Sequence, residues 1–95
     1  MTFDDFSASL EKDTPPEGVT PELQGLWWDG KGNWDKSHET VQDLASKEAA
    51  WVHAYLHRKE GDIWNADYWY SRAGKVRPKA GLEEEWEAMV KALLM

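Results

Sequence analysis

The fold is decided by the stretch SKEAAWVHAYLHRKEGDIWNADYWYSRAG, which spans residues 46–74. Its apolar residues recur at helical spacing, and Ser46 stands where the N-cap of a helix is expected. Gly61 then interrupts the pattern, because a glycine in this position commonly ends one helix before another begins. The stretch therefore predicts two helices, over about residues 47–60 and 63–73, joined by a tight turn.

A weak internal repeat extends this arrangement upstream. It places Gly32 over Gly61, an offset of 29 residues, and each copy has a glycine turn between two helical patterns. In the second copy, small, large and small side chains occupy Ala66, Tyr70 and Ala73, which share one helical face. Small outer residues let a neighbouring helix approach closely. The repeat therefore predicts two stacked helical hairpins.

The rest of the chain also has helical punctuation. Its patterns predict further helices at about residues 3–12, 21–29, 34–44 and 82–94. No segment alternates polar and apolar residues with the period of a strand. A length of 95 residues suits one domain. We expect a single all-α domain over residues 1–95, with five or six short helices: two hairpins and a C-terminal helix.

Two resemblances accompany this pattern. Gly61-Asp62 followed by Ala66 and Tyr70 resembles the second half of a tetratricopeptide-type hairpin, and the likeness covers about residues 20–74. It implies two tandem tetratricopeptide-like hairpins, although the offset of 29 residues is shorter than the usual ~34. The stretch WVHAYLHRKEGD at 51–62, with the NA and YWY that follow it, resembles a family of short microbial proteins of unknown function. The second resemblance implies no activity.

Composition excludes several classes of function. The net charge of −7 argues against nucleic acid as a partner and against binding to anionic membrane surfaces. The absence of Cys excludes disulfides, thiolate metal sites and Cys nucleophiles. No apolar run approaches the ~20 residues of a membrane span, and no signal-peptide pattern opens the chain. We therefore expect a cytoplasmic protein.

The three histidines form the first candidate site. His53 and His57 are four residues apart on one helical face, Glu60 follows one turn later, and His38 lies on the preceding helix. This set defines one hypothesis, a metal-dependent or histidine-based enzyme, which requires the imidazoles to converge within ~2.0–2.1 Å of one ion. However, Ala54 stands where the metalloprotease motif has its catalytic Glu. We therefore expect no metal or cofactor, and histidines that instead hydrogen-bond neighbouring groups.

The aromatic residues suggest the leading function. Seven of the 95 residues are Trp, too many aromatics crowd residues 51–70 for all to be buried, and exposed aromatics favour a ligand groove. The leading prediction is a non-enzymatic module that binds a peptide, a protein or a small ligand. Its groove is predicted to be lined by His38, Trp51, His53, His57, Trp64 and Tyr68. A third possibility is a homo-oligomer that uses exposed aromatics as its interface.

A basic run follows the fifth predicted helix. Residues 72–79 contain four Lys and Arg side chains, and an acidic run follows at residues 83–85. Positive charge is favourable at a helix C-terminus and negative charge at an N-terminus. We therefore expect the two runs to stabilise helix ends and to pair with each other.

Overall fold

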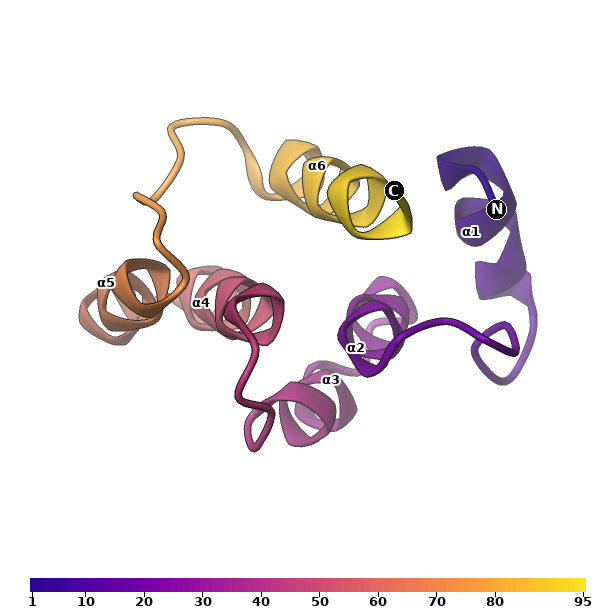
Figure 1. The fold of residues 1–95 in the computed structure, drawn as a ribbon, viewed down its shortest axis with the longest axis horizontal. Coiled ribbons are helices and arrows are strands. Elements are labelled where there is room, and N and C mark those ends of the chain that lie inside the picture. The colour runs from indigo at the N-terminus through magenta and orange to yellow at the C-terminus, as the bar shows by residue number, and fades with distance from the viewer.

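The computed structural model describes residues 1–95 and contains six α-helices and no strand (Figure 1). The α-helices are Phe3–Ala8 (α1), Pro21–Gly30 (α2), Trp34–Val41 (α3), Lys47–Glu60 (α4), Ile63–Arg72 (α5) and Leu82–Leu94 (α6), with a short 3-10 helix (η1) at Ser9–Glu11. The prediction of an all-α fold is confirmed. None of these helices has both the length and the apolar character needed to cross a membrane.

The two hairpin turns have the same construction. Gly32 and Gly61 adopt positive φ angles of 83° and 90°, a conformation that only glycine adopts without strain. The residue after each glycine is an N-cap: Asn33 accepts a hydrogen bond from the backbone of Lys36, and Asp62 accepts one from that of Asn65. The repeat found in the sequence is thus present in the backbone.

The two hairpins stand side by side, and α6 packs against both of them. Helix α2 packs on α3, α4 packs on α5, and α3 and α2 both contact α4 (Figure 1). Helix α6 lies over α2 and α4, and α1 packs beside α6. This arrangement puts α4 at the centre of the fold. Helix α3 ends three residues earlier than predicted, because the backbone N–H of Leu44 bonds to Val41 in a turn.

The predicted small, large and small face of α5 is buried. Ala66 is fully buried, Tyr70 is 1% exposed and Ala73 is 7% exposed. Ala66 and Tyr70 form a small cluster with Ala54 of α4, so the two helices touch through alanine side chains. The close approach leaves no room for a larger residue at Ala66.

A buried carboxylate fixes α6 to the second hairpin. Glu85 accepts hydrogen bonds from the Tyr70 hydroxyl at 2.7 and 2.8 Å and from the Trp51 indole at 3.3 Å, and it pairs with Arg58 of α4 at 2.7 Å. Burial and the adjacent carboxylate raise the pKa of Tyr70, so its hydroxyl stays protonated and donates. The sequence predicts that the basic run at residues 72–79 pairs with the acidic run at residues 83–85. For Glu85 this prediction is wrong, because its cationic partner is Arg58 of α4.

We predict that Ala66→Leu destabilises the protein. The added atoms overpack the contact between α4 and α5, which typically costs ~1–3 kcal/mol. For a domain of this size, each kcal/mol lowers the Tm by roughly 4–8 °C. Thermal unfolding followed by circular dichroism measures the change.

Ala92→Leu is the matched control, because Ala92 is exposed on α6. Its stability should stay within ~0.5 kcal/mol of the parent chain. A parental Tm for Ala66→Leu would contradict the close packing of α4 on α5.

Candidate functional site

Three imidazole rings meet where α3 crosses α4. The Nε2 atoms of His38 and His53 lie 3.0 Å apart. One ring nitrogen from each of His38, His53 and His57 lies within 4.8 Å of the other two. The ring centre of His57 is 5.3 Å from the ring centre of His38 and 4.7 Å from that of His53. The sequence left open whether the histidines converge, and in the structure they do.

Helix geometry explains this convergence. His53 and His57 are one turn apart on α4, so their side chains project from the same face. His38 lies in the last turn of α3 and reaches that face from the neighbouring helix. Trp34, one turn earlier on α3, donates its indole N–H to the backbone oxygen of Leu56 at 2.8 Å. This bond ties the start of α3 to α4 and thereby sets the position of His38.

Two tryptophan rings stack on imidazoles of the cluster. The ring of Trp34 stacks on His38 with centres 4.9 Å apart and planes 9° apart. The ring of Trp69, from α5, stacks on His53 with centres 4.0 Å apart and planes 23° apart. Neither tryptophan was among the predicted site residues. The spacing of four residues between Trp34 and His38 signals that contact, whereas the contact of Trp69 depends on how α5 crosses α4.

The other predicted lining residues lie away from the imidazoles. Trp51 contacts Glu85, and its ring lies 4.0 Å from the ammonium group of Lys75. Trp64 is 82% exposed and Tyr68 is 48% exposed on α5. Of the six predicted lining residues, the three histidines come together, and the aromatic rings beside them belong to two other tryptophans.

The burial of the cluster favours neutral imidazoles. His53 is 6% exposed, and burial together with the neighbouring His38 and His57 lowers its pKa to about 4. Burial, followed by the nearby His57, also lowers the pKa of His38. At neutral pH both rings are therefore uncharged. The hydrogen bond between their Nε2 atoms then has a proton on one nitrogen and a lone pair on the other.

The third imidazole is oriented by a carboxylate. The Nδ1 atom of His57 lies 3.1 Å from Oε1 of Glu60, one turn later on α4. When Nδ1 donates to this carboxylate, the lone pair of neutral His57 is on Nε2. A carboxylate behind an imidazole is the usual outer partner of a metal-binding histidine, because it fixes the ring and its tautomer.

The donor set suits a transition-metal ion. In a tetrahedral zinc site with Zn–N bonds of about 2.0–2.1 Å, neighbouring nitrogens lie ~3.3 Å apart. The separation of 3.0 Å between His38 and His53 is near this value, and all three ring nitrogens lie within 4.8 Å of one another. Three imidazoles leave a fourth position for water or another ligand.

The chain was compared with known proteins at three levels. No family model, no curated protein and no solved structure matches it. The geometry of the histidine cluster therefore carries the functional argument.

We predict that the metal-free protein loses stability as the pH falls through the range from 6.5, the usual histidine pKa, to about 4, the native pKa of His53. In this range the unfolded chain binds a proton that the folded chain does not, so the free energy of unfolding rises with pH. Urea unfolding in the presence of a chelator, at several pH values across this range, measures the slope.

A His53→Gln variant should show a shallower slope, because it lacks the buried group that resists protonation. The same slope in both proteins, or a stability independent of pH across this range, would contradict the burial of a neutral His53.

Proposed function

We propose that this protein binds one divalent transition-metal ion through His38, His53 and His57. The observation that carries the proposal is the convergence of one nitrogen from each ring to within 4.8 Å of the others. This proposal replaces the metal-free arrangement that we expected from the sequence, in which the histidines hydrogen-bond neighbouring groups.

The protonation of the site supports the proposal. A metal ion requires neutral imidazoles, and protons compete with it for the same nitrogens. The lowered pKa values of His38 and His53 reduce that competition at these two ligands. The Nε2 atoms of His38 and His53 already lie 3.0 Å apart, so a metal ion that displaces the proton between them would find both nitrogens close at hand.

The donor atoms define the class of ion. Three imidazole nitrogens favour Zn²⁺, Cu²⁺ or Ni²⁺, whereas Mg²⁺ and Ca²⁺ prefer oxygen ligands. The role of Glu60 in this arrangement is to orient His57 from behind. The enzyme hypothesis uses the same four residues, and a metal-bound water in the fourth position is its chemical starting point.

We predict that the untagged protein binds Zn²⁺ or Ni²⁺ with a stoichiometry of one ion per chain. Isothermal titration calorimetry and elemental analysis after dialysis measure this stoichiometry. His38→Ala and His57→Ala should abolish stoichiometric binding, because each leaves two ligands. Glu60→Gln should weaken the affinity by about tenfold or more, because it removes the outer partner of a ligand.

Glu39→Gln is the matched control, because Glu39 is exposed beside His38 and is not a ligand. Its affinity should match that of the parent chain. Binding that survives in His57→Ala, or that falls equally in Glu39→Gln, would show that the ion is attracted by the acidic surface and not held by the imidazoles.

The exposed aromatics of α5 favour a second function, the binding of a peptide or protein partner. Trp64 and Tyr68 are 82% and 48% exposed on this helix, and the aliphatic Ile63 beside them is 37% exposed. Large exposed aromatics of this kind are typical anchors of protein interfaces. The resemblance to tetratricopeptide-type hairpins supports the same proposal.

We predict that Trp64→Ala and Tyr68→Ala fold normally and lose a partner that the parent chain retains. Truncating such an anchor typically costs more than ~2 kcal/mol of binding. Pull-downs with the three proteins, with folding checked by circular dichroism, test this prediction. Variants that unfold, or that retain every partner, would contradict a docking role for this face.

A further inference from the structure

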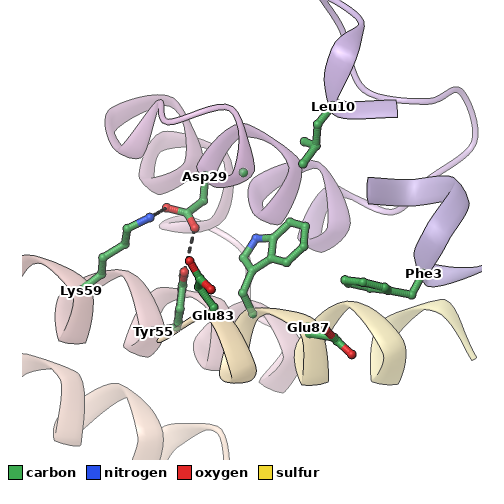
Figure 2. Close-up of a pocket in the computed structure, with 9 residues that line it drawn as sticks. Phe3, Leu10, Asp29, Tyr55, Lys59, Glu83 and Glu87 are labelled. Carbon is green, nitrogen blue, oxygen red and sulfur yellow. Dashed lines mark hydrogen bonds and ion pairs between the residues drawn. The ribbon is translucent and has the colours of Figure 1, made fainter. Parts of the chain in front are cut away.

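A second concave site shares no residue with the histidine cluster. A cavity of about 360 Å³ opens between α1, η1, α2, α4 and α6, which is within the size range of small-ligand pockets (Figure 2). Figure 2 shows Phe3 and Leu10 extending into it from the N-terminal segment, Glu83 rising from α6, and Glu87 further along the same helix. The cavity thus combines apolar walls with carboxylates.

At one side of the cavity, the protein already holds an ammonium group. The Nζ atom of Lys59 lies 2.9 Å from Oδ1 of Asp29 and 6.0 Å from the centre of the Tyr55 ring (Figure 2). The hydroxyl of Tyr55 donates to the same carboxylate at 2.9 Å. A cation here is paired with a carboxylate and lies near an aromatic ring.

The other side repeats this combination. The Nζ atom of Lys91 lies 2.6 Å from Oε2 of Glu87 and 5.5 Å from the centre of the Phe3 ring. Cations near aromatic faces are stabilised electrostatically, by ~0.5–1 kcal/mol at exposed sites. Both Glu87 and Phe3 line the cavity. Two lysines of the chain therefore show what kind of group these walls accommodate.

Glu83 differs from the other two carboxylates of the cavity. Asp29 and Glu87 each have a lysine partner, whereas Glu83 makes no ion pair within 4.0 Å. Trp86, three residues later on the same helix, also lines the cavity. Its indole N–H is already bonded to the backbone of Leu26 at 3.0 Å, so the indole contributes apolar surface.

We propose that this cavity binds a small organic ammonium ion. The positive nitrogen pairs with Glu83, and the apolar part of the ligand lies against Trp86, Phe3 and Leu10. The site would then reproduce, with an external cation, the combination of carboxylate and aromatic ring that the two lysines already form.

Charge and geometry disfavour an anion or a shared metal ion in this cavity. Three carboxylates, at Asp29, Glu83 and Glu87, against the single lysine in its lining disfavour an anion. These carboxylates are not among the groups whose oxygens lie within 4.8 Å of one another, so they do not share one metal ion. An ammonium ion with an apolar body matches both the charge and the volume.

Benzylamine is a suitable probe, because it joins a primary ammonium group to a flat apolar ring. Benzyl alcohol is the matched neutral compound. Titrations followed by the NMR signals of the indole N–H groups, with a chelator present, should show saturable binding of benzylamine centred on Trp86. Benzyl alcohol should bind about tenfold more weakly, because it lacks both the ion pair and the cation–aromatic attraction.

Glu83→Gln should weaken benzylamine binding about three- to fivefold, the effect of a single partly exposed ion pair. Glu84→Gln is the matched control, because Glu84 lies in the same first turn of α6 and does not line the cavity. It should bind benzylamine like the parent chain. Equal affinity for benzylamine and benzyl alcohol, equal losses in the two variants, or an absence of saturable binding would each overturn the proposal. Because a chelator is present, the outcome is independent of the metal site.

Discussion

The structure depends on the burial of α4 from almost every side. Eight of its fourteen residues are buried, and α2, α3, α5 and α6 all pack against it. A helix with so little polar surface is stable only when other helices cover it. The two hairpins and α6 therefore form one unit, because each covers a different part of the same helix. The stacking of the hairpins follows from this requirement, as does the position of α6 across them.

The burial of α4 also explains the polar contacts inside the fold. An unpaired polar group inside a protein costs ~1–3 kcal/mol, so the buried polar side chains of α4 require hydrogen-bond partners. Tyr55 finds Asp29 of α2, Arg58 finds Glu85 of α6, and His53 finds His38 of α3. Every buried side-chain nitrogen and oxygen in the protein has a hydrogen-bond partner. The contact between His53 and His38 differs from the other two because it joins two imidazoles, with a third imidazole, that of His57, beside them.

The features that the sequence predicts are the local ones. The N-cap at Ser46, the turn at Gly61 and the shared face of His53 and His57 are all set by residues a few positions apart, and the structure has each of them. The contacts that were missed join residues distant in sequence. The pairing of α6 with a guanidinium of α4 and the stacking of an α5 tryptophan on an imidazole depend on helix crossing angles, which local patterns do not encode. The convergence of the imidazoles could be predicted only in part. The repeat places α3 beside α4, but it does not fix the rotation of either helix about its axis.

X-ray absorption spectroscopy at the metal edge of the Zn²⁺-loaded, untagged protein tests the central claim most directly. We expect three imidazole nitrogens at about 2.0–2.1 Å, with the multiple-scattering pattern of histidine rings, and one further light-atom ligand. A first shell of oxygens alone, or a spectrum with one imidazole or none, would contradict it.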